Sequence, residues 1–329
     1  MKKTACFLAL LSIILFFFGA GLAPERDIIK WVDFKVPYGI LHLAYKYDVD
    51  TAYDNIHLDM CEMLAYLSAK NGNSFSNKDY KELNKLAQAL KTGIKTEDLI
   101  KGDKRYYKYY LECYRAIFAR FLDYYVTEDG QTGYGLIAYY PIAKGYGVTS
   151  YDDFGNRRTY GFKRRHTGHD MFGATGTPII AVEGGTVTEF GWNRYGGWRV
   201  GIRSDDGKRF YYYAHLRKNR PYAQGLEKGA KVAAGQVIGY MGATGYSIKE
   251  NKNMNVNPHL HFGLQLIFDE SQVKGNNEIW IDVNNICKLL EHNRAATVKD
   301  PETKEHKSVN LRRPISKKHF KDKLFKKSA

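Results

Sequence analysis

The sequence has 329 residues, which allows two domains, and its hydrophobic share of 44% is ordinary for a folded protein. The formal net charge of +15 indicates anionic surroundings, such as nucleic acid, a cell wall or a membrane surface. No nucleic-acid-binding motif accompanies this charge. A membrane-tethered nucleic-acid binder therefore rests on charge alone, and we expect no nucleic acid among the partners.

The first 23 residues combine a basic start with an apolar run. Lys2 and Lys3 precede residues 5–23, which as a helix would be about 28 Å long, close to the hydrocarbon thickness of a bilayer. A cleaved signal peptide would give a secreted protein, whereas an uncleaved anchor would hold the chain in the membrane. We favour the anchor, because Pro24 hinders cleavage after Ala23. Both interpretations predict that the rest of the chain is exported.

A helical module is predicted over residues 24–128, because apolar residues there recur at helical spacing. A tyrosine-rich stripe on its last helix suits core packing between helices better than the alternative, binding of glycan strands. The expected elements are an extended segment at 28–37 and helices at 54–70, 76–91, 96–102 and 104–126.

The four cysteines lie at positions 6, 61, 113 and 287, and no two of them form a C-x-x-C pair. This spacing excludes a structural zinc finger and does not make a disulfide framework. Buried free thiols are the favoured interpretation, with a Cys61–Cys113 disulfide as the alternative.

Beyond a polar linker at residues 127–133, glycines become frequent and β-branched and aromatic residues alternate. Short strands with tight turns indicate an antiparallel sheet with an open groove, within a domain at residues 129–298. The fold class is therefore α+β, a helical module followed by this sheet domain. Strands are expected at 135–141, 177–182, 185–190, 198–204, 209–215, 231–240, 259–266 and 279–281, with a closing helix at 284–293.

Residues 299–329 form a basic tail with eleven lysines or arginines against four acidic residues. Its few apolar residues predict disorder. It could be a solvated tail without function, or it could adhere to anionic wall polymers or lipid head groups.

Two histidine motifs stand out in the sheet domain: His166-Thr-Gly-His-Asp170 and His259-Leu-His261. A catalytic Zn²⁺ is usually held by three histidine or carboxylate ligands. His166, Asp170 and one histidine of the second motif would supply that set. Residues two apart in a strand share a face, so His259 and His261 are expected to point into the same site.

Four segments in order, RRHTGHDMFGATGTPIIAVEGGTV, YYYAHL, GQVIGYMGATG and NPHLHFGLQL, resemble the lysostaphin/LytM-type zinc peptidases. The resemblance covers about residues 140–270 and implies cleavage of peptide stems or cross-bridges in bacterial peptidoglycan. It implies zinc ligands at His166, Asp170 and His261, with His215 and His259 beside the metal-bound water. His169 lies outside the family pattern and receives no role.

The sequence thus predicts an exported zinc endopeptidase that acts on peptidoglycan during cell-wall remodelling. No glutamate follows in an H-E-x-x-H arrangement, so His215 and His259 are the candidates for general base and oxyanion stabiliser, in an order left open. The alternative is a non-catalytic peptidoglycan-binding scaffold or regulator, against which the complete five-residue set argues.

Overall fold

The structure, a computed structural model, describes residues 28–159 and 163–320. The chain divides into one unit of residues 1–30 and a second, compact unit of residues 31–329. The apolar run at 5–23 lies outside the described residues, so its role as anchor or signal peptide stays a prediction. Among the described residues, no helix has both the length and the apolar character needed to cross a bilayer.

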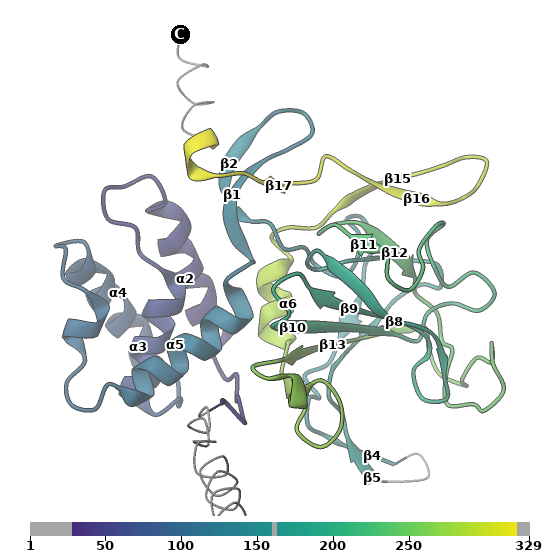
Figure 1. Cartoon of the computed structure of the whole chain (residues 1–329), viewed down its shortest axis with the longest axis horizontal. Coiled ribbons are helices and arrows are strands. Elements are labelled where there is room, and N and C mark those ends of the chain that lie inside the picture. The colour runs from purple at the N-terminus through teal and green to yellow at the C-terminus, as the bar shows by residue number, and fades with distance from the viewer. Residues whose placement is uncertain (1–27, 160–162, 321–329) are drawn as a thin grey trace, which may run out of the picture. The chain divides into compact units, whose positions relative to one another are not determined.

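The N-terminal part of the second unit is helical, and it includes a helix at residues 38–50 that the apolar spacing did not predict. Its elements are α2 (Tyr38–Asp50), α3 (Met60–Asn71), α4 (Lys78–Leu90), η1 (Thr96–Leu99) and α5 (Arg105–Phe118) (Figure 1). The carboxylate of Asp59 caps α3 by accepting from the Glu62 N–H at 3.0 Å, and Gly72 ends that helix at φ +64°. The tyrosines Tyr107 and Tyr114 of α5 are buried, which supports core packing of the stripe.

The predicted long helix at 104–126 is wrong in its second half. Helix α5 ends at Phe118, and the chain continues as strand β1 (Leu122–Val126), antiparallel to β2 (Thr132–Leu136). The predicted linker is the turn of this hairpin, closed by the Thr127 N–H donating to the Gln131 carbonyl at 2.8 Å. Aromatic and β-branched residues favour a strand when a neighbouring strand can pair with them. The pairing strand β2 lies beyond the residues from which the helical spacing was read, so the local pattern could not reveal it.

An antiparallel sheet of eight strands forms the centre of the sheet domain (Figure 1). Its order is β11-β8-β9-β10-β13-β6-β3, with β14 paired to β13. The predicted α+β class is therefore confirmed. The strands are β3 (Thr149–Ser150), β6 (His169–Phe172), β8 (Gly185–Asn193), β9 (Gly197–Ser204), β10 (Arg209–Ala214), β11 (Lys231–Val232), β13 (His259–Leu266) and β14 (Ile279–Ile281).

Smaller elements flank this sheet. Helix α6 (Asn284–Leu290) lies between the N-terminal helices and the sheet, and the Asn285 side chain donates to the Val36 carbonyl at 3.0 Å. Two further pairs are antiparallel: β4 (Arg157–Thr159) with β5 (Lys163–Arg165), and β7 (Pro178–Ile180) with β12 (Val237–Tyr240).

A buried arginine joins the helices to the sheet. Arg209 on β10 is fully buried, and its guanidinium contacts both oxygens of Glu183 at 2.7 and 3.1 Å. Its Nη1 donates to the carbonyl of Ala116 in α5 at 2.6 Å. A charge removed from water requires such partners, so this network holds α5 against the sheet. The division into a helical module and a peptidase domain near residue 128 stays a prediction.

Residues 299–320 of the C-terminal tail are ordered, so the prediction of disorder is wrong for this part of the tail. Strand β15 (Ala296–Lys299) pairs with β16 (His306–Val309), and β17 (Arg313–Pro314) pairs with β1. The Tyr240 hydroxyl donates to Glu305 at 2.6 Å, and Phe320 is buried. Composition predicts disorder because few residues are apolar, but strand pairing and these anchors hold the segment. Residues 321–329 lie outside the described part.

The cysteines at 61, 113 and 287 are buried free thiols. The Cys61–Cys113 disulfide considered above is therefore not formed. Cys6 lies outside the described residues.

Candidate metal centre and active site

Two paired strands bring the two histidine motifs together. In the β6–β13 pair, Asp170 lies opposite His261 and Phe172 lies opposite His259. Cross-strand partners share a face of the sheet, so Asp170, His259 and His261 point to the same side. His169 precedes Asp170 in the strand and therefore points to the other side, where it is buried.

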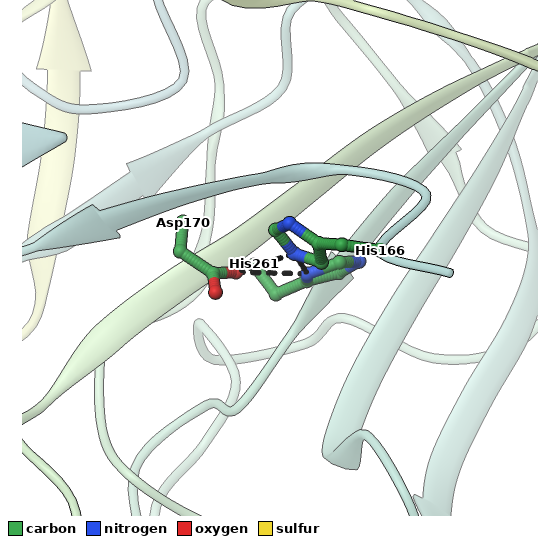
Figure 2. Close-up of side chains that lie close together, drawn as sticks. All are labelled: His166, Asp170 and His261. Atoms are coloured by element: carbon green, nitrogen blue, oxygen red, sulfur yellow. Dashed lines mark hydrogen bonds and ion pairs between the residues drawn. The ribbon is translucent and has the colours of Figure 1, made fainter. Parts of the chain in front are cut away.

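The three predicted ligand atoms converge (Figure 2). His166 Nε2 lies 3.1 Å from Asp170 Oδ1 and 3.0 Å from His261 Nδ1. His261 Nδ1 lies 2.9 Å from Asp170 Oδ1. His166 comes from the short segment between β5 and β6. All three side chains are largely buried. They form the group among the described residues that could hold a metal ion, and their role as ligands stays a prediction.

Two residues that sequence reasoning missed surround this cluster. Asp153 Oδ1 lies 3.0 Å from Nδ1 of His166, and Arg158 Nη2 donates to Asp170 Oδ2 at 3.1 Å. Arg158 also pairs with Asp153. Both lie upstream of the histidine motif, in a stretch whose residue pattern carries no signal of its own. Only the approach of the β4–β5 hairpin to β6 reveals them.

The chemistry of the three facing atoms fits a metal cation. A carboxylate only accepts hydrogen bonds, so His166 donates from Nδ1 to Asp153, and Nε2 is the nitrogen that can offer a lone pair to a metal. That lone pair faces an oxygen of the Asp170 carboxylate, and two electron-rich atoms repel each other. A cation bound between them would make this arrangement favourable. Bonds of about 2.0–2.1 Å to tetrahedral zinc place ligand atoms roughly 3.3 Å apart, close to the separations here.

The protonation states of two of these residues suit metal binding. Burial alone would raise the pKa of Asp170, but the neighbouring His166 and His261 outweigh it and hold that pKa below its usual range. Burial lowers the pKa of His261. The carboxylate is therefore ionised and the imidazole neutral, the forms in which both bind metals.

The other two predicted site histidines lie beside the cluster. The rings of His215 and His259 are 4.7 Å apart between centroids, and the rings of His215 and His261 are 5.9 Å apart. His215 follows β10 with a left-handed φ of +61°, and its Nδ1 lies 2.8 Å from the Thr244 carbonyl. Nδ1 of His259 lies 2.9 Å from the Asn257 carbonyl. Burial, with the nearby imidazoles of His259 and His261, lowers the pKa of His215 well below its usual range.

All five predicted site residues line one cleft of about 700 Å³. Aromatic side chains form much of its wall, namely those of Tyr195, Tyr212, Tyr246 and Trp280. Gly168 leaves room for a ligand side chain, because a Cβ there would stand 2.5 Å from Cε1 of His261. The glycine of the first motif thus has a steric role.

The sequence comparisons agree with this geometry. Residues 164–278 match the family model described as Peptidase family M23. This segment is a Peptidase M23 domain. The predicted resemblance to lysostaphin/LytM-type peptidases is therefore confirmed for the domain.

Curated relatives match part of this chain. The chain is 40% identical over 124 residues to the L-Ala–D-Glu endopeptidase of Bacillus subtilis, covering 38% of this chain and 36% of that protein. It is 34% identical over 142 residues to the glycyl-glycine endopeptidase ALE-1 of Staphylococcus capitis, covering 42% and 33%. The chain thus spans about a third of the length of these relatives.

A solved structure aligns with a larger share of the chain than the M23 family model does. The LytM structure from Ruminococcus gnavus aligns with a TM-score of 0.53 and 24% identity, covering 79% of this chain and 89% of that one. This likeness concerns the fold, and it extends beyond the M23 domain.

Proposed function

We propose that this chain is a zinc-dependent endopeptidase that hydrolyses peptide bonds in peptidoglycan stems or cross-bridges. The observation that carries the proposal is the convergence of two histidine nitrogens and one carboxylate oxygen, with two further histidines beside them in one cleft. The names of both curated relatives describe endopeptidases, which supports hydrolysis of a peptide bond.

His166 Nε2, His261 Nδ1 and Asp170 Oδ1 would hold the zinc ion. Bound Zn²⁺ would supply Lewis-acid polarisation of a peptide carbonyl and a more acidic water. Asp153 holds His166 in the tautomer with a lone pair at Nε2. Arg158 donates to the second oxygen of Asp170, which leaves the first oxygen directed at the two histidines.

His215 and His259 would move the protons. Each Nδ1 lies against a backbone carbonyl, which only accepts, so Nδ1 carries the proton and Nε2 keeps a lone pair. Each Nε2 can therefore take a proton and later return it to the leaving amine. The lowered pKa of His215 keeps that ring neutral at physiological pH, which is the form that a general base requires. Once the Nε2 of the other ring holds a proton, that ring would donate to the oxyanion and stabilise it.

We place the enzyme outside the cytoplasm, tethered by the apolar N-terminal run, with secretion after cleavage as the alternative. The formal net charge of +15 supports contact with anionic surroundings. Basic residues of the C-terminal tail would add contacts to anionic wall polymers. A tether limits the enzyme to nearby strands of the wall, which suits remodelling.

The deciding experiment is digestion of purified peptidoglycan by the full chain in mild detergent, with released fragments identified by mass. Hydrolysis is expected with zinc and is expected to stop with a chelator. The His319→Ala variant is the matched control, because His319 is exposed and distant in sequence from the cleft residues. Binding to peptidoglycan without any released fragment would contradict the proposal and support a non-catalytic scaffold.

A further inference from the structure

The cleft carries more positive than negative side chains. Three of its lining residues are acidic: Asp170, Glu189 and Glu278. Six are basic: Arg158, Arg164, Arg165, Arg199, Arg203 and Lys274.

Three of the six basic side chains are neutralised by carboxylates. Arg158 pairs with Asp170 at 3.1 Å and Arg199 with Glu189 at 3.3 Å, and Arg203 pairs with Glu270. Across residues 28–159 and 163–320, Arg164, Arg165 and Lys274 have no carboxylate partner. Arg165 and Lys274 are exposed, so water solvates their charges. Arg164 differs, because it is half-buried.

Arg164 is held in place without being neutralised. Its guanidinium carbon lies 4.9 Å from the centre of the Tyr246 ring, a cation–π contact. Its Nε is buried and has no hydrogen-bond acceptor among the described residues. A buried donor without an acceptor costs free energy, and a ligand bound in the cleft would give the guanidinium the acceptors that the described residues do not.

Arg164 also lies close to the proposed proton acceptor. The Tyr246 ring beneath its guanidinium is 6.0 Å from the ring of His215 between centroids. Tyr246 and His215 both have left-handed backbones, at φ +44° and +61°. Such strain in residues other than glycine persists where the surrounding structure requires one side-chain position. Arg164 thus lines the same cleft as His215, with the Tyr246 ring in contact with both.

We propose that Arg164 binds a carboxylate of the substrate peptide beside the scissile bond, so that the cleft selects carboxylate-bearing stem peptides over uncharged glycyl bridges. The inference rests on the proposed function and adds the substrate class. A guanidinium binds a carboxylate through two parallel hydrogen bonds, a geometry that an amide cannot reproduce. An uncharged bridge would leave the guanidinium unpaired, and sites with an unpaired buried group discriminate strongly.

The test compares native peptidoglycan with the same material after its carboxyl groups are converted to amides. We expect kcat/KM of the wild-type chain to fall about tenfold to a hundredfold on amidation, the range for hydrogen bonds to charged groups. On native material, kcat/KM of Arg164→Gln should be lower than that of the wild-type chain by the same factor. Amidation of the material should not lower kcat/KM of this variant further. Arg164→Lys should recover part of the loss, because it restores the charge without the two-pronged geometry.

The matched control is Arg194→Gln. Arg194 also lies over a tyrosine ring, 5.0 Å from the centre of Tyr195, but does not line the cleft. It should leave the preference for native material unchanged. Equal kcat/KM of the wild-type chain on native and amidated material would overturn the inference. It would also be overturned if Arg164→Gln lowered kcat/KM by the same factor on both materials.

A binding measurement separates this inference from the proposed function. If neither substrate is hydrolysed, the proposed function fails. The inference about Arg164 is then decided by comparing the affinity of the His215→Ala chain for a soluble stem peptide with its affinity for the amide of that peptide. Intrinsic tryptophan fluorescence, to which Trp280 in the cleft contributes, reports that binding. Tenfold tighter binding of the carboxylate form supports the role of Arg164, and equal binding refutes it.

Discussion

Asp153 Oδ1 lies 3.0 Å from His166 Nδ1, on the opposite side of the imidazole from the nitrogen that faces Asp170 and His261. This contact selects the tautomer of a proposed metal ligand from outside the metal centre. It also ties the centre to the β4–β5 hairpin, because Arg158 on β4 pairs with both Asp153 and Asp170.

Asp153→Asn is therefore expected to weaken zinc binding about tenfold to a hundredfold, the usual cost of losing an outer partner of a metal-binding histidine. The measurement is competition with a chromophoric chelator, which does not depend on activity. Asp152→Asn is the control, because it removes an exposed neighbouring carboxylate. Equal zinc affinity in the two variants would show that Asp153 does not orient His166.

Removal of one ligand should abolish stoichiometric zinc. Asp170→Ala leaves two histidines, and two ligands rarely fix a catalytic metal. We expect the metal content of the purified variant to fall far below that of the wild-type chain, measured by elemental analysis after dialysis. Zinc near one ion per chain in this variant would remove Asp170 from the site.

His215→Ala and His259→Ala are expected to keep zinc and lose turnover. Loss of a positioned acid or base commonly lowers the rate about a hundredfold or more. Release of peptidoglycan fragments and zinc content are measured on the same samples, with His319→Ala as the control. Wild-type turnover in either variant would exclude that residue from proton transfer.

Gly168→Ala should damage the metal centre through steric overlap. The added Cβ would meet Cε1 of His261 at 2.5 Å, Nε2 at 2.6 Å and the Phe262 carbonyl oxygen at 2.8 Å. Because the carbonyl cannot move freely, we expect His261 to be displaced and zinc affinity to fall at least tenfold. Gly147→Ala is the control, since nothing lies within 4 Å of a Cβ there. Unchanged affinity in the Gly168→Ala variant would show that His261 adapts.

The helical part should show a pH-dependent stability from His57. The hydrogen bond with Asp48, at 2.8 Å, raises the pKa of His57 above its ordinary value of 6.5, against the effect of burial. A raised folded-state pKa stabilises the fold below pH 6.5, and this contribution is lost as the pH rises through the folded-state pKa.

The free energy of unfolding of His57→Gln is compared with wild type by urea titration between pH 5 and pH 8. The destabilisation by the substitution should be larger at pH 5 than at pH 8. The effect is modest, because the His57 side chain is 32% exposed. A difference that stays constant with pH would mean that the ion pair with Asp48 does not contribute.

The sequence by itself determined the elements with strong local patterns. Alternation over residues 259–266 predicts a strand, and the two-residue period of a strand puts His259 and His261 on one face. The segments shared with M23 peptidases identified the domain and pointed to His166, Asp170 and His215, because such motifs are read directly from residue order.

Pairings between distant segments were decided only by the tertiary structure. Residues 122–126 fit a helical stripe locally, yet they form β1 because β2 and the tail strand β17 provide backbone partners on both sides. The register of β6 against β13 places Asp170 opposite His261. Asp153, Arg158 and the Arg164–Tyr246 contact depend on loops and hairpins that meet across the fold. Local spacing reports which face a side chain occupies, but a hydrogen bond or ion pair between distant residues forms only after the chain has brought them together, and no periodicity within one segment encodes that meeting.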